Sequence, residues 1–216
     1  MIRKFSFAKS AKKQLAGQGA QDAYVIEFAA HTAKSVDEIW GALVKPEKIT
    51  AWLMPVSGKL AKGGAFRLGD LAEGSISVCE PKRRLSIDLV RGTSRQMIDI
   101  TFGEEGKGKS KQRNIVVTIT ANLADLPEGN WQKLGPAALG MGWELVAQAL
   151  QDYLAGEQAA PRQGDIMAFA SSAAGRAFCS EAFSGWRAAA IAGGADAGIM
   201  AGQAPSVLQI YSGLHA

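Results

Sequence analysis

Few residues in this chain have the types and spacing that enzyme chemistry requires. The sequence holds two histidines, His31 and His215, and two cysteines, Cys79 and Cys179, without Cys-x-x-Cys spacing. A nucleophilic triad needs a histidine beside the nucleophile, and a zinc site needs several clustered histidines or cysteines. The composition therefore predicts no catalytic residue, no metal site and no cofactor, and it predicts that both cysteines are buried and reduced.

One stretch, residues 103–110, fits the G-x-x-x-x-G-K-S pattern of a P-loop, which cradles nucleotide phosphates. A P-loop works because a helix follows it at once and directs its N-terminal amides at the phosphates. Here the β-branched run of residues 115–120 follows, which predicts a strand, and Glu104 and Glu105 would repel phosphate. We therefore predict a hairpin tip and no nucleotide partner.

Pairs of carboxylates that could share acid–base work are also not indicated. Glu80 falls at a predicted turn, while Asp88 and Asp99 fall on the water-facing side of predicted strands. General acid–base catalysis needs such groups within hydrogen-bond reach of a substrate. The sequence therefore favours binding over catalysis.

Basic residues dominate the start of the chain. Five lysines and arginines precede the first acid, Asp22, and the net charge of the whole chain is +4. Such an acid-free arm is typical of a solvated tail, of an anion-binding segment or of a transit peptide. We favour the solvated tail for residues 1–22.

A second basic group is predicted at one end of the sheet. Alternate turns of an antiparallel meander lie at the same end, which collects a basic rim of Lys62, Lys82, Arg83, Arg84, Lys107, Lys109, Lys111 and Arg113. Such a rim could attract an anionic headgroup or an acidic partner and would raise the encounter rate. Solvated hairpin tips are the favoured alternative, and the absence of interleaved aromatic residues argues against single-stranded nucleic acid.

Hydrophobic periodicity predicts the elements that position these residues. Residues 23–30 alternate, with Tyr24, Ile26 and Phe28 on one side, which indicates a half-buried strand. Over residues 56–123 the period stays at two and turn residues recur, which indicates six antiparallel strands with one buried face. The prediction is a curved antiparallel sheet of about seven strands.

Two helical regions interrupt and follow the strands. Ser35 with Glu38 three residues later forms a capping box, which predicts a short helix and one or two further turns. A long helix is predicted over residues 134–154, with Pro136 in its first turn and Gly156 at its stop. An amphipathic helix after a meander is expected to pack on the concave side of the sheet.

The long helix carries an apolar stripe that includes Gly140 and Trp143. Glycine costs about 1 kcal/mol relative to alanine within a helix, so we predict that Gly140 leaves room for a ligand and that Trp143 faces the sheet. Met141 and Leu145 fall on the opposite side and need cover. We expect the apolar helical segment of residues 169–191 to fold back over them, with a second copy of the protein as the alternative.

The predicted fold class is α+β, with a basic arm at residues 1–22, a central domain at 23–156 and a helical extension at 157–216. The chain is 47% hydrophobic, yet no apolar run approaches the roughly 20 residues that span a bilayer. We expect a cytoplasmic protein without integral membrane association, present as a monomer or homodimer.

Several motifs together resemble the START-like or SRPBCC superfamily, whose fold is called the helix grip. They are Ile39-Trp40-x-Ala42-Leu43-x-x-Pro46 and Trp52, Gly63-Gly64-x-Phe66, Cys79-Glu80-Pro81-x-x-Arg84-Leu85, and Leu134-Gly135-Pro136 with Gly140-x-Gly142-Trp143. They look most like the branch homologous to the activator of heat-shock-protein ATPase, the Aha type. Ser184-x-Trp186, Ile191-Ala192 and Gly194 resemble the helical extension of some bacterial members.

The resemblance implies a cavity between long helix and sheet, used across the superfamily for lipids, sterols, polyketides and plant hormones. Its predicted lining is Trp40, Trp52, Phe66, Leu85, Ile87, Leu89, Ile100, Trp131, Gly140 and Trp143. For each of these residues, simple core packing is the alternative. The first hypothesis is binding of a small hydrophobic molecule without catalysis, and the second is a co-chaperone-like module with a chaperone or another protein as its partner. A cyclase or hydrolase of the superfamily is a third, which lacks an acid–base pair.

Overall fold

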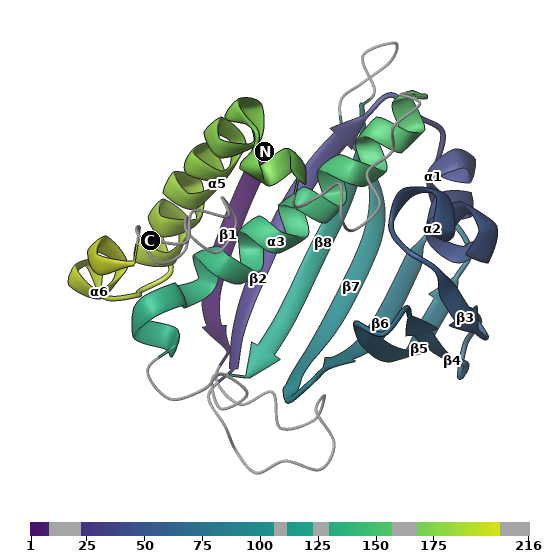
Figure 1. The fold of residues 1–216 in the computed structure, drawn as a ribbon, viewed down its shortest axis with the longest axis horizontal. Helices are drawn as coiled ribbons and strands as arrows, with labels where there is room; N and C mark the ends of the chain where they lie inside the picture. The colour runs from purple at the N-terminus through teal and green to yellow at the C-terminus, as the bar shows by residue number, and fades with distance from the viewer. Residues whose placement is uncertain (9–22, 106–111, 123–129, 157–167, 204–216) are drawn as a thin grey trace.

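The computed structural model describes residues 1–8, 23–105, 112–122, 130–156 and 168–203 (Figure 1). The strands are β1 (Ile2–Ala8), β2 (Ala23–Thr32), β3 (Val56–Gly58), β4 (Ala65–Leu68), β5 (Ala72–Glu80), β6 (Arg84–Arg91), β7 (Ser94–Glu105) and β8 (Gln112–Asn122). The helices are α1 (Val36–Val44), α2 (Pro46–Trp52), α3 (Asn130–Ala155), α5 (Ala173–Ala192) and α6 (Ala197–Gly202). No helix within these described ranges is long and apolar enough to span a membrane.

The strands form one open antiparallel sheet in the order β1-β2-β8-β7-β6-β5-β4-β3. The chain crosses from β2 to the opposite edge through α1 and α2, and the meander from β3 to β8 then returns to pair with β2. The long helix α3 lies across one face of the sheet, with α1 and α2 toward one side and α5 toward the other (Figure 1). The predicted α+β fold class and the six strands of the meander are confirmed.

Strand β1 is the principal departure from prediction. Residues that we expected in a solvated tail pair with β2 from Ile2 opposite Ala29 to Ala8 opposite Ala23, giving the sheet eight strands. The tail prediction weighed charge alone, but in this strand the basic Arg3 has a buried partner. The other predicted arm residues, 9–22, lie outside the described residues.

The helix start signals are confirmed in detail. The Glu38 backbone N–H donates to Ser35 Oγ at 3.2 Å, and the Ser35 N–H donates to Glu38 Oε2 at 2.9 Å. This capping box satisfies two amides that the first turn of α1 would leave unpaired. Trp52 at the end of α2 donates from Nε1 to the Ala42 carbonyl at 2.9 Å, which ties α2 to α1.

The start of α3 is kinked where the sequence has Gly135-Pro136. Gly135 is non-helical with φ of 52° and ψ of −161°, a conformation that suits glycine, so the regular helix begins at Pro136 as predicted. The preceding turn from Asn130 was not predicted. Gly156 has a φ of 84° and follows the last helical residue, which confirms the predicted stop.

The helical extension packs against the side of α3 that is turned away from α1 and α2 (Figure 1). Met141 and Leu145 are fully buried and belong to the same apolar cluster as Phe183 and Trp186 of α5. Cover of this patch within one chain is therefore confirmed. Ile191, the last residue of the segment that we expected to fold back, is 40% exposed at the end of α5.

Candidate ligand cavity

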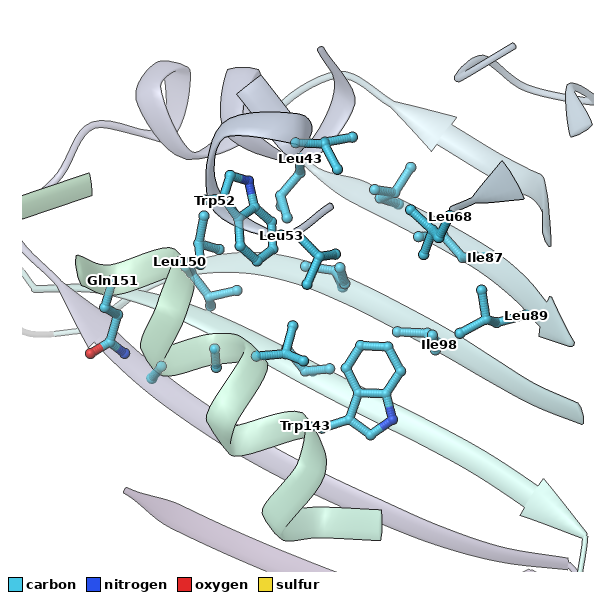
Figure 2. A pocket seen from close by; sticks show the side chains of 18 of the residues that line it. Leu43, Trp52, Leu53, Leu68, Ile87, Leu89, Ile98, Trp143, Leu150 and Gln151 are labelled. Carbon is cyan, nitrogen blue, oxygen red and sulfur yellow. The ribbon is translucent and has the colours of Figure 1, made fainter. Parts of the chain in front are cut away.

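An apolar cavity of about 130 Å³ lies between α3, the two short helices and the sheet. Its wall takes residues from every strand except β1 and β3, from α1, α2 and α3, and from the loops beside them. Figure 2 shows Trp143 and Leu150 of α3 on one side, Trp52 and Leu53 on another, and Leu89 and Ile98 on the sheet. The cavity therefore occupies the space that the helix-grip resemblance implies.

The structure places most of the predicted lining on this wall: Trp52, Phe66, Leu85, Ile87, Leu89, Ile100 and Trp143. The strand residues reach it because alternation turns Leu85, Ile87 and Leu89 of β6 to the same face. On α3, residues at helical spacing from Trp143 to Leu154 face the same space.

Three predicted lining residues lie elsewhere. The Trp40 ring packs edge-on against Phe102, with ring centroids 5.9 Å apart, away from the cavity wall. Trp131 lies in an aromatic cluster with Phe5, 6.1 Å between centroids. Both tryptophans were assigned by residue type, which does not distinguish core packing from cavity lining.

The prediction that Gly140 makes room for a ligand is wrong. A Cβ atom at this position would overlap the indole ring of Trp186, which is fully buried on α5. The missing side chain therefore makes room for another helix. Gly140 lies about 60° around α3 from Trp143, and that rotation is enough to turn it from the cavity toward α5.

Sequence reasoning missed the part of the wall contributed by β2, β8 and one residue of β7. It consists of Phe28, Ala30 and Thr32 of β2 and Ile115 and Val117 of β8, together with Ile98 of β7. Period-two alternation was available as a signal for all of them. The missing information was that β8 pairs with β2, because this pairing joins strands about 90 residues apart in the sequence.

The cavity wall is almost free of polar groups. Within the described part of the chain, Thr32 and Gln151 are its polar residues, and no charged residue lines it. Trp143 has its indole N–H occupied, since Nε1 donates to Gln96 Oε1 at 2.9 Å. Such a wall can hold an uncharged apolar group, and it offers no pair of titratable groups for acid–base work. Among the described residues, no group of histidine, cysteine, aspartate or glutamate could hold a metal ion.

The predicted basic rim is partly neutralised by ion pairs. Arg84 Nη2 lies 2.6 Å from Asp99 Oδ2, and Lys82 Nζ lies 2.5 Å from Asp37 Oδ1. Arg83 is exposed, and its carbonyl accepts a bond of 3.3 Å from the Phe102 N–H, which brings this turn beside β7.

The structure describes only some of the remaining rim residues. Lys62 is exposed in the loop before β4, and Arg113 lies in β8 opposite Thr32. Lys107, Lys109 and Lys111 fall outside the described residues. The P-loop-like stretch begins in β7 and is followed by β8, so the prediction that a strand follows is confirmed.

Comparisons with known proteins identify a shared fold. No protein-family model matches the sequence, and no curated protein matches it. The crystal structure of CalU16 from Micromonospora echinospora is similar with a TM-score of 0.59 at 22% identity, covering 87% of this chain and 96% of CalU16. EF2215 from Enterococcus faecalis, a conserved protein of unknown function, is similar with a TM-score of 0.53 at 14% identity, covering 86% and 92% of the two chains. The chain therefore has the helix-grip fold, and its resemblance to the Aha-type branch stays a prediction.

Proposed function

We propose that this protein binds a small, uncharged hydrophobic molecule in the cavity beside α3 and performs no chemistry on it. The observation that carries the proposal is the wall itself, which brings apolar side chains from six strands and three helices around one space. A protein interior is normally filled to crystal-like density, so an unfilled apolar space of this size calls for an occupant.

The size of the cavity limits the occupant. Engineered apolar cavities of about 150 Å³ stay dry and bind benzene, and the space here is about 130 Å³. Leu53, Leu60 and Leu68 on the wall remain partly exposed, so a larger molecule could extend past them into solvent. The enclosed part of the ligand is thus a single ring or a chain segment.

The test combines extraction with a cavity-filling variant. Organic extraction of the purified protein followed by mass spectrometry should yield a retained apolar molecule, and Nile red should bind to the emptied protein. Ala147 on α3 lines the cavity, so Ala147→Phe should fill it and weaken Nile red binding at least tenfold. Ala155→Phe, at the exposed end of the same helix, is the matched control and should bind like the wild type.

The co-chaperone-like alternative makes the opposite prediction. It rests on the motif resemblance, and it requires a protein partner and no occupied cavity. If the extract contains no apolar molecule and Ala147→Phe binds Nile red like the wild type, ligand binding in this cavity is refuted and the protein-interaction role becomes the better hypothesis.

A further inference from the structure

The cavity wall carries two polar side chains that are available to a ligand. Among the described wall residues, the side-chain polar groups are those of Thr32 and Gln151 and the indole N–H groups of Trp52 and Trp143. Both indoles already donate to protein oxygens, each at 2.9 Å. Thr32 and Gln151 are therefore the wall side chains that could form hydrogen bonds with an occupant.

These two residues lie toward the same end of the wall. The start of α3 lies beside the start of β2, since the ring centroids of Trp131 and Tyr24 are 5.4 Å apart. Both elements run from there toward the end of the sheet near α1 (Figure 1). Thr32 is the last residue of β2, and Gln151 is in the last turns of α3, so both lie toward α1.

The described wall is apolar over a long distance away from this end. Leu89 of β6 pairs with Gln96, and the register continues across β8 to Tyr24 of β2. Tyr24 precedes Thr32 by eight residues, which is about 26 Å along a strand at about 3.3 Å per residue. Figure 2 likewise shows Gln151 at the opposite side of the drawn wall from Leu89. Within the described wall, an occupant therefore meets these polar side chains at one end.

Both residues can donate a hydrogen bond to a ligand. Thr32 Oγ1 accepts the Lys34 backbone N–H at 3.1 Å, which leaves the hydroxyl hydrogen of Thr32 to donate elsewhere. The Gln151 amide is partly exposed and has no hydrogen-bond partner among the described residues, whereas Gln148 donates to Asp152 Oδ1 at 2.7 Å. A carbonyl oxygen has two lone pairs, so it can accept from both donors at once.

We propose that Gln151 and Thr32 bind the carbonyl oxygen of an otherwise apolar ligand, such as a ketone or an ester. The inference rests on the proposed hydrophobic-ligand function. It goes further by naming the chemical class of the ligand and its orientation, with the carbonyl toward α1 and the hydrocarbon toward Phe66 and Leu89. A few polar groups in an otherwise apolar pocket commonly fix the orientation of a ligand in this way.

The test compares two ligands of the same shape in competition with Nile red. 2-Octanone carries the carbonyl, and 2-methyl-1-octene has a CH₂ group in place of the oxygen and accepts no such hydrogen bond. The measured quantity is the ratio of the ketone affinity to the alkene affinity, each calculated with the Nile red affinity of the same variant. This ratio cancels changes in packing that affect both ligands equally.

Variants of the two residues remove one donor at a time. Gln151→Leu removes the amide at similar size and should lower the ratio about fivefold, the effect of one net hydrogen bond between uncharged groups. Leucine is as good a helix former as glutamine, so the fold should survive. Thr32→Val removes the hydroxyl and should lower the ratio by a similar factor, while Thr32→Ser keeps the hydroxyl and should retain the wild-type ratio. Gln148→Leu removes an amide of the same helix that is not on the wall, and as the matched control it should leave the ratio unchanged.

The outcomes distinguish the two proposals. If the wild type binds neither Nile red nor either competitor, the proposed function fails and this inference fails with it. If both competitors bind and either Gln151→Leu or Thr32→Val keeps the wild-type ratio, ligand binding stands and the carbonyl site is refuted. An equal fall of the ratio in Gln148→Leu would also refute it.

Discussion

Gly140 shows how one absent side chain decides where a helix packs. Its position in the apolar stripe predicted space for a ligand, but the Trp186 ring of α5 lies where a Cβ atom of residue 140 would be. The Trp186 ring also meets Phe28 of β2 edge-on, with centroids 6.5 Å apart. The glycine therefore lets a large aromatic residue reach from the extension toward the sheet beside α3.

The first prediction concerns Gly140→Ala. Alanine is the better helix former by about 1 kcal/mol, but its methyl group would overlap Trp186, and overpacking of this kind costs about 1 to 3 kcal/mol. We expect a lower free energy of unfolding in urea and unchanged Nile red affinity. Gly202→Ala in α6, where a Cβ meets nothing within 4 Å, is the matched control and should not destabilise. A Gly140→Ala protein more stable than the wild type would contradict this packing.

The second prediction concerns Asp99 on the outer face of the sheet. Desolvation raises the pKa of this carboxyl, but hydrogen bonds from Arg84 and Ser86 outweigh it and hold the pKa below its ordinary value. A depressed pKa in the folded state contributes stability above the ordinary value of about 3.9 and loses it as the pH falls through the folded pKa. Asp99→Asn should therefore destabilise at pH 7, and the difference from wild type should shrink below about pH 4. A difference that stays constant between pH 7 and pH 2 would show that the pair contributes nothing.

At the scale of elements, β1 and α5 act together on α3. Arg3 of β1 reaches Glu144 of α3 with two hydrogen bonds, Nε to Oε1 at 2.6 Å and Nη2 to Oε2 at 2.9 Å. Glu144 is fully buried, and Glu181 of α5 lies 3.5 Å from the same guanidinium. The space for the Arg3 side chain exists because Gly185 of α5 has no Cβ. A strand, a helix of the extension and the long helix are thus joined at one ion pair.

The third prediction is a double-mutant cycle on this pair. Arg3→Met leaves the Glu144 carboxylate buried without its arginine, which should cost about 3 to 5 kcal/mol of unfolding free energy. Adding Glu144→Leu removes the buried charge and should recover most of the loss, because apolar replacement of a buried pair is often nearly neutral. Urea unfolding of the four proteins measures the coupling. Additive losses in the double variant would show that the two residues do not interact.

At the scale of the whole molecule, α3 contacts different parts of the structure on its different sides. One side of the helix borders the cavity, while another is held by β1 and α5. No residue of β1, α5 or α6 lines the cavity among the residues that the structure describes. Stability and ligand affinity should therefore respond to different substitutions.

The fourth prediction uses Trp186→Ala to test this separation. Trp186 is fully buried, and removing such an anchor should cost about 3 to 5 kcal/mol of unfolding free energy. The folded variant should nevertheless bind Nile red with the wild-type affinity, measured well below its unfolding temperature. A matched loss of stability and affinity would show instead that the extension controls the cavity.

Local patterns in the sequence determined most of the elements. The capping box at Ser35, the Pro136 start, the Gly156 stop and the alternation of β6 each depend on residues a few positions apart, so they could be predicted without a fold. The helical periodicity of residues 134–154 likewise predicted that Trp143 faces the sheet and that Met141 and Leu145 are covered by other parts of the protein.

Contacts between distant residues were decided by the tertiary structure alone. From the sequence, Arg3 was predicted in a basic tail, but in the structure it forms an ion pair with Glu144. Gly140 was predicted to leave space for a ligand, but in the structure Trp186 occupies that position. Both pairs join residues more than 40 positions apart in the sequence. The local periodicity around one residue does not identify a partner at such a distance. The sequence by itself determined which faces are apolar, whereas only the packed structure decided whether an apolar face meets a cavity or another helix, because the apolar periodicity is the same in both cases.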